Sequence, residues 1–300
     1  MNSAAALAQA IVTAHAARWQ GFAAQPTPPS PAHASSIYQG ALAACSQLGF
    51  IAADAQCLAQ AWERQSARLG QFDATLWPAD GRDFGVQGRA RAGAFPACPA
   101  QLGLYAVLPD AAWVARMARA GVPTLQLRCK SEEAAVVAQE VHAAVTAVQG
   151  TGARLFINDH WREAIAAGAY GVHLGQEDLD ALSAAELAAL RASGLRLGLS
   201  THGYAEMLRA DAVAPSYIAL GAVFPTTLKK MATAPQGLAR LTAYVQLLAG
   251  YPLVAIGGIG AEQFGAIRAT GVGSIAVVRA LVQAPEPEQQ AQQLLQLLAA

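Results

Sequence analysis

Lysine is rare in this sequence: it occurs only at Lys130, Lys229 and Lys230, and the other 17 of the 20 basic residues are arginine. Acidic residues also number 20, so the chain has no net positive charge. Because nucleic acids and anionic membranes attract proteins through a positive field, we expect neither as a partner. In a chain so poor in lysine, the position of each one is informative.

Cysteine is also scarce and forms no metal-binding or disulfide pattern. Cys45, Cys57, Cys98 and Cys129 show neither a CxxC pair nor a zinc-type spacing with histidine. The stretch 1–19 lacks an early basic residue and a long uninterrupted apolar run, which argues against a signal peptide or a membrane span. With 54% hydrophobic and 13% charged residues, the composition is that of a globular protein, and we expect it in the cytoplasm.

The first 100 residues are predicted to form a small, mostly helical region with a linker. Helical periodicity covers roughly 3–19, 38–48 and 54–69, with a proline-rich break at 25–33. Residues 70–100 are rich in glycine, proline, aspartate and arginine without periodicity, which indicates a linker or irregular loop. Composition therefore divides the chain into domains at 1–100 and 101–300.

Eight short apolar runs alternate with helical patterns after residue 100. They begin at Gly103, Thr124, Arg154, Gly171, Arg196, Tyr217, Pro252 and Ser274. Successive runs start about 24 residues apart, the length of a strand, a helix and two short loops. Nearly continuous apolar strands are typical of a parallel sheet buried on both faces. An open doubly wound sheet also fits this count, but no GxGxxG motif follows the first run, so we predict a (β/α)₈ TIM barrel.

Polar residues gather where the predicted strands end, which in a barrel is the face that binds ligands. Asp159 and Asp178 follow two neighbouring strands. Their carboxylates suit Mg²⁺, which takes oxygen ligands and keeps waters and substrate phosphate oxygens. Asp159 alone would more simply cap a helix, but its pairing with Asp178 favours a metal site.

Cationic residues at the same face predict a site for a strongly negative group. Gln126, Arg128 and Lys130 are two positions apart, so on a strand their side chains share a face. With Lys229 from the end of the sixth strand they would surround a diphosphate. Arg128 can bind it through two parallel hydrogen bonds, whereas the lysines act as point charges. Lys230 is expected to face solvent.

A second anion site is predicted after the seventh strand. Gly257 and Gly258 let backbone amides approach a phosphate there. The sequence offers no Ser/His/Asp relay and no cysteine nucleophile. These residues therefore favour the departure of a charged leaving group, stabilised electrostatically and without a covalent enzyme intermediate.

Six segments in order resemble the thiamine phosphate synthase family over about residues 101–282. They are QLRCK (126–130), FINDHW (156–161), GVHLGQEDL (171–179), GLSTH (198–202), GAVFPTTLKK (221–230) and VAIGGIG (254–260). The resemblance implies a transferase that joins hydroxymethylpyrimidine diphosphate to thiazole phosphate with Mg²⁺, giving thiamine phosphate and diphosphate. The thiazole nitrogen has a lone pair and no proton to lose, so its attack needs no dedicated base.

The resemblance also implies roles for individual residues. Those that would bind the pyrimidine diphosphate are Gln126, Arg128, Lys130, Asn158 and Lys229, with His173 near the ring and Ser200 beside the reacting groups. Asp159 and Asp178 would hold Mg²⁺. The thiazole phosphate would contact Thr226, Gly258, Val278 and Arg279. The predicted catalytic residues are Arg128, Lys130, Ser200 and Lys229.

Two positions depart from the family pattern. Leu228 stands where the family's P-T-x-T-K motif has its second threonine, which leaves Thr227 as the candidate for that hydroxyl contact. Arg279 stands where serine is common and would add a cation to the phosphate site. Residues 41–62 are weakly similar to the C-terminal helices of hydroxymethylpyrimidine phosphate kinases, which would make the N-terminal region a relic without kinase activity.

Two other functions stay open at this point. A thiazole tautomerase of the same superfamily would use His202 as its acid and base and would not need the diphosphate-binding residues. A non-catalytic barrel would bind a ligand, with the N-terminal region contacting a partner. The full set of diphosphate-binding residues favours the synthase and its small-molecule substrates. The sequence leaves the oligomeric state open, a homo-oligomer included.

Overall fold

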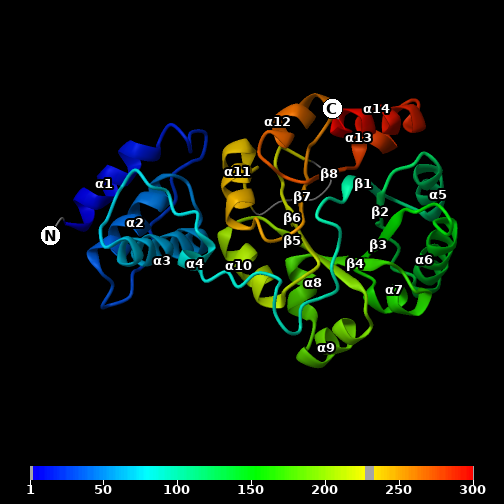
Figure 1. The fold of residues 1–300 in the computed structure, drawn as a ribbon, viewed down its shortest axis with the longest axis horizontal. Helices are drawn as coiled ribbons and strands as arrows, with labels where there is room; N and C mark the ends of the chain where they lie inside the picture. The colour runs from blue at the N-terminus through cyan, green and yellow to red at the C-terminus, as the bar shows by residue number, and fades with distance from the viewer. Residues whose placement is uncertain (1–2, 227–232, 300) are drawn as a thin grey trace. The chain divides into compact units, whose positions relative to one another are not determined.

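The computed structural model describes residues 3–226 and 233–299 (Figure 1). By its contacts the chain forms two compact units. The first comprises residues 1–87, 203–212 and 246–248, and the second comprises residues 88–202, 213–245 and 249–300. The domain division at residue 100, drawn from composition, stays a prediction.

Helices build most of the first unit, as the periodicity of the sequence predicts. They are α1 (Ala4–His15), α2 (Ser36–Gln47), α3 (Ala52–Leu69) and α4 (Gly81–Phe84). Trp19, Trp62 and Trp77 are buried and pack near one another, so they belong to the core of this unit. The expectation of an irregular stretch at 70–100 was wrong at α4, where the Asp80 side chain accepts the Arg82 amide and starts a short helix.

Residues 203–212, which include all of helix α10 (Tyr204–Val213) except its last residue, belong to the first unit. Asp54 is buried and accepts the amide of Ala205 at 2.9 Å, 151 residues away in the sequence. This bond satisfies one of the free N–H groups at the start of a helix. The ring of Phe84 stacks on Tyr204 with centroids 5.3 Å apart. The first unit is therefore completed by a segment from far along the chain.

Eight parallel strands close into a barrel in the second unit, which confirms the predicted fold. They are β1 (Gly103–Leu108), β2 (Thr124–Leu127), β3 (Arg154–Asn158), β4 (Gly171–Leu174), β5 (Arg196–Thr201), β6 (Tyr217–Leu220), β7 (Leu253–Ala255) and β8 (Ser274–Val277). Each strand pairs with the next in sequence, and β8 pairs with β1.

The strands alternate with helices, as a (β/α)₈ chain requires. Besides α10, these are α5 (Ala111–Arg119), α6 (Ala134–Ala147), α7 (Trp161–Ala167), α8 (Gln176–Ala181), α9 (Ala184–Ala192), α11 (Gly237–Leu247), the 3₁₀ turn η1 (Ala261–Gln263), α12 (Phe264–Arg268), α13 (Arg279–Val282) and α14 (Pro287–Ala299). Within residues 3–226 and 233–299, no helix has both the length and the apolar character needed to cross a membrane.

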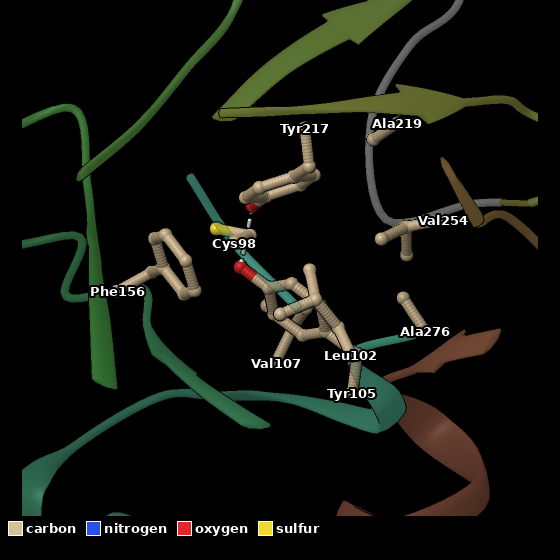
Figure 2. Close-up of a cluster of buried hydrophobic side chains, with 9 residues drawn as sticks. All are labelled: Cys98, Leu102, Tyr105, Val107, Phe156, Tyr217, Ala219, Val254 and Ala276. Carbon is tan, nitrogen blue, oxygen red and sulfur yellow. Dashed lines mark hydrogen bonds between the residues drawn. The ribbon is translucent and has the colours of Figure 1, made fainter. Parts of the chain in front are cut away.

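Buried side chains, three aromatic rings among them, fill the inside of the barrel (Figure 2). Tyr105, Phe156 and Tyr217 point inward from β1, β3 and β6 and pack with ring centroids 5.1 to 6.0 Å apart. Gly198 on β5 makes room for them, because a Cβ there would lie 2.1 Å from the Tyr217 ring. This packed layer is the floor beneath the strand ends.

Candidate active site

A cavity of about 650 Å³ lies where the barrel strands end. That size suits a small-molecule ligand, since such sites usually measure roughly 300–1,000 Å³. The predicted site residues that line it are Gln126, Arg128, Asn158, Asp159, His173, Asp178, Ser200, Thr226, Gly258, Val278 and Arg279. The structure therefore brings together side chains from the ends of seven strands.

Of the three remaining predicted site residues, the structure describes one. Lys130 is exposed and does not line the cavity. The reasoning that put it on one strand face with Arg128 was wrong, because β2 ends at Leu127 and the alternation of side chains stops there. Thr227 and Lys229, like Leu228 and Lys230, lie outside the described residues. Their assignment to the site stays a prediction.

The carboxyl groups of Asp159 and Asp178 interact at the ends of β3 and β4. Asp159 has a φ of 64°, in the left-handed region that aspartate tolerates better than most residues. Asp178 accepts the Gly175 amide at 2.8 Å and so closes the first turn of α8. Desolvation first, and then the neighbouring Asp178 carboxyl, raise the pKa of Asp159 to about 6, while Arg128 opposes the rise.

This carboxylate pair fits a magnesium ion bound partly by substrate. Among the described residues, no group of three or more His, Cys, Asp or Glu side chains is placed to hold a metal. Mg²⁺ does not need such a cage, because it is usually held by one or two carboxylates together with waters and substrate phosphates. A cation beside Asp159 would also offset the repulsion that raises its pKa. The donor set therefore fits Mg²⁺ better than zinc.

A continuous chain of hydrogen bonds crosses the floor of the cavity. Its links are Asn158 Oδ1 to Gln126 Nε2 (2.7 Å), Gln126 Oε1 to Tyr105 Oη (2.9 Å), Tyr105 Oη to Tyr217 Oη (2.7 Å), Tyr217 Oη to His173 Nδ1 (2.7 Å) and His173 Nε2 to Ser200 Oγ (2.8 Å). All these residues except Ser200 are buried. The site therefore presents Asn158, Gln126, His173 and Ser200 in fixed orientations.

Sequence reasoning missed the two tyrosines in this chain. Tyr105 and Tyr217 stand in the apolar runs GLYAVLP and YIALGAV and looked like ordinary core residues. The available signal was a hydroxyl on an inward-facing strand position, because a buried tyrosine usually finds a hydrogen-bond partner. Burial raises the pKa of both hydroxyls, which keeps them protonated at neutral pH.

The end of β7 forms a second part of the cavity from backbone. Gly257 and Gly258 have φ values of 105° and 66°, which favour glycine. A Cβ on Gly258 would lie 2.5 Å from the Pro225 carbonyl oxygen, so no side chain fits there. Val278 and Arg279, at the end of β8, line the same part of the cavity. Because neither glycine carries a side chain, the main chain itself forms this part of the cavity wall, which suits an anionic group.

The sequence and the fold were compared with known proteins. A family model described as thiamine monophosphate synthase matches residues 104–281. A thiamine-phosphate synthase of Neisseria meningitidis serogroup B is 57% identical over 194 residues, which cover 65% of this chain and 93% of that protein. One from Serratia proteamaculans is 52% identical over 204 residues, covering 68% and 95%. Among solved structures, a thiamine phosphate pyrophosphorylase from Pyrococcus furiosus matches with a TM-score of 0.59 and 26% identity, covering 66% and 96%.

Proposed function

Since the chain belongs to the thiamine monophosphate synthase family, we propose that it is a transferase that joins a pyrimidine diphosphate to a thiazole phosphate. The substrates are 4-amino-2-methyl-5-hydroxymethylpyrimidine diphosphate and 4-methyl-5-(2-hydroxyethyl)thiazole phosphate. The products are thiamine phosphate and diphosphate. The observation that carries this proposal is the cavity itself, whose lining combines Arg128, the acidic pair Asp159 and Asp178, and the backbone of Gly257 and Gly258.

The proposed reaction exchanges one bond for another without a proton transfer. The bond between the pyrimidine methylene carbon and the diphosphate oxygen breaks, and the diphosphate keeps the electron pair. The thiazole nitrogen uses its lone pair to form the new bond to that carbon and becomes a thiazolium. Because this nitrogen carries no proton, the chain has to supply position and charge rather than a general base.

The departing diphosphate is the group that needs stabilisation. Arg128 lines the cavity beside the acidic pair and can donate two parallel hydrogen bonds to phosphate oxygens. Asp159 and Asp178 would hold Mg²⁺, which when bound neutralises charge on the leaving group. Lys130 and Lys229 belong to this proposal through the family motifs alone, and Lys130 would have to reach the diphosphate from its exposed position after β2.

The pyrimidine ring would lie over the hydrogen-bonded floor of the cavity, and the thiazole would lie near the residues that follow β6, β7 and β8. Gln126, Asn158, His173 and Ser200 would orient the pyrimidine, because their polar atoms are held by the hydrogen-bond chain. The thiazole phosphate would lie against Thr226, Gly258, Val278 and Arg279. Arg279 adds a positive charge at that end of the cavity. This arrangement would bring the thiazole nitrogen toward the carbon that loses diphosphate.

The test is a product assay on the purified full chain with both substrates and Mg²⁺. We expect thiamine phosphate and diphosphate to appear in equal amounts. Omission of either substrate, or addition of excess chelator, should abolish both products. Failure to form either product under the complete conditions would overturn the proposal. Tautomerisation of a thiazole phosphate in the absence of the pyrimidine diphosphate would point instead to the tautomerase.

A further inference from the structure

The hydrogen-bond chain beneath the cavity has a direction that can be worked out from its donors and acceptors. Gln126 accepts the Tyr105 hydroxyl through its amide oxygen and donates to Asn158 through its amide nitrogen. The single proton of Tyr105 is therefore used on Gln126. Tyr105 can only accept in its 2.7 Å contact with Tyr217, so Tyr217 is the donor.

The tautomer of His173 follows from the same assignment of donors and acceptors. The proton of Tyr217 is used on Tyr105, so Tyr217 can only accept in its contact with His173 Nδ1. His173 must then carry its proton on Nδ1, which leaves Nε2 unprotonated in the neutral ring. Nε2 accepts the Ser200 hydroxyl at 2.8 Å. Ser200 is left with its oxygen lone pairs for the cavity.

We propose that Tyr105 and Tyr217 are positioning residues that set the His173 tautomer and thereby the donor and acceptor pattern of the site. In this pattern Asn158 offers its amide N–H groups at one end of the cavity floor, and Ser200 offers an acceptor at the other. Figure 2 shows the two tyrosine hydroxyls pointing toward each other inside the barrel. The inference rests on the proposed function, because it assigns the pattern to recognition of the aminopyrimidine ring.

The donors and acceptors of the aminopyrimidine ring match the direction of the hydrogen bonds beneath the cavity. An aminopyrimidine carries an amino donor and ring-nitrogen acceptors, so it needs both an acceptor and a donor from the protein. Asn158 neighbours Asp159 and lies in the same cavity as Arg128, where donors also suit the diphosphate. If every hydrogen bond ran in the opposite direction, Asn158 would present an acceptor to the cavity and His173 would donate to Ser200. The Asn158 end of the cavity would then fit an anion less well.

The tautomer can be measured directly by ¹⁵N NMR of the histidine ring at about pH 8, where a histidine of ordinary pKa is neutral. Protonated and unprotonated ring nitrogens have distinct shifts, and the His173→Gln variant identifies the signals of His173. We expect the wild-type full chain to show His173 protonated on Nδ1. Protonation on Nε2 would overturn the inference, and this measurement needs no tyrosine variant.

The Tyr105→Phe variant tests the coupling. It frees the Tyr217 proton, which can then be donated to His173 Nδ1, so we expect the tautomer to switch to Nε2–H. The matched control is Phe156→Leu, which disturbs the same aromatic layer without removing a hydrogen bond and should keep the Nδ1–H tautomer. An unchanged tautomer in Tyr105→Phe, or the same switch in Phe156→Leu, would contradict the role of Tyr105 in setting the His173 tautomer.

Kinetics of the same variants separate this inference from the proposed function. We expect Tyr105→Phe to raise the KM for the pyrimidine diphosphate about tenfold, the effect of mispairing a buried hydrogen bond, with a smaller change for the thiazole phosphate. Equal changes in KM for both substrates would contradict a role of Tyr105 that is specific to the pyrimidine diphosphate. If the protein shows the expected tautomers but makes no thiamine phosphate, the inferred direction of the hydrogen bonds holds and the proposed function fails.

Discussion

The carboxyl groups of Asp178 and Asp159 interact, and desolvation first, then this interaction, raise the pKa of Asp159 from 3.8 to about 6. The folded chain therefore holds this proton more tightly than the unfolded chain does. Between pH 3.8 and about 6 this group makes the free energy of unfolding fall as the pH rises. We predict that Asp159→Asn removes this dependence, so that its Tm relative to wild type is higher at neutral pH than at pH 4. Asparagine is the suitable replacement, because it tolerates the left-handed φ of 64°.

Thermal melts across this pH range, with chelator present, provide the measurement. A Tm difference between wild type and Asp159→Asn that is constant with pH would contradict the coupling of the two carboxylates. Mg²⁺ supplies a second comparison at neutral pH. It should raise the Tm of the wild-type chain by a few degrees and leave that of Asp159→Asn nearly unchanged. Equal Tm shifts of the two proteins on addition of Mg²⁺ would contradict metal binding by Asp159 and Asp178.

Arg128 is expected to act through the shape of its guanidinium as well as through its charge. Arg128→Lys keeps the charge and loses the paired hydrogen bonds, so we predict a fall in kcat/KM of about tenfold. Arg128→Ala loses both and should lower kcat/KM by roughly 100-fold or more. The control is Arg119→Lys, at the exposed end of α5. Steady-state kinetics that show full activity for Arg128→Lys would reject two-point binding.

The close approach at Gly258 predicts a selective loss of thiazole phosphate binding. In Gly258→Ala the new Cβ would meet the Pro225 carbonyl oxygen, and the φ of 66° would be strained. We expect the KM for the thiazole phosphate to rise at least tenfold, with a loss of stability of about 1–3 kcal/mol. Gly265→Ala in α12 is the matched control, because its Cβ would meet nothing within 4 Å. An equal rise in KM for the pyrimidine diphosphate would place Gly258 elsewhere in the reaction.

The barrel, and the fact that most of the proposed site residues line one cavity, could be predicted from the sequence because both depend on short-range patterns. Each apolar run became a strand, and the residues that follow the strands, such as Asp159 and Ser200, reached the cavity. The exposed position of Lys130 was not foreseen, because the end of β2 depends on hydrogen bonding that no spacing rule reveals. The contact between Tyr105 and Tyr217 was missed because it joins residues 112 positions apart. Such contacts arise only once the barrel closes and sets the register of opposite strands.

The buried carboxylate of Asp54 predicts a stability effect in the first unit. Asp54→Ala removes the acceptor of the Ala205 amide and leaves the start of α10 without that bond, at a cost of about 1–2 kcal/mol. Asp73→Ala is the control, since the side chain of Asp73 accepts two hydrogen bonds from nearby Thr75 and is only partly buried. Denaturant unfolding followed by tryptophan fluorescence reports on this unit through Trp19, Trp62 and Trp77. Equal midpoints for the two variants would mean that the Asp54 bond contributes nothing measurable.

Gly198 is predicted to be irreplaceable because the Tyr217 ring occupies the space where its side chain would lie. A Cβ at this position would come within 2.1 Å of the ring, and both residues are enclosed by the barrel. The ring cannot move away without giving up its hydrogen bonds to Tyr105 and His173. We therefore expect Gly198→Ala to lose about 1–3 kcal/mol of stability and to lower kcat/KM as well. Gly250→Ala, whose Cβ would meet nothing within 4 Å, should do neither. If Gly198→Ala unfolds at the same denaturant concentration as wild type, the packing of this layer is looser than the structure indicates.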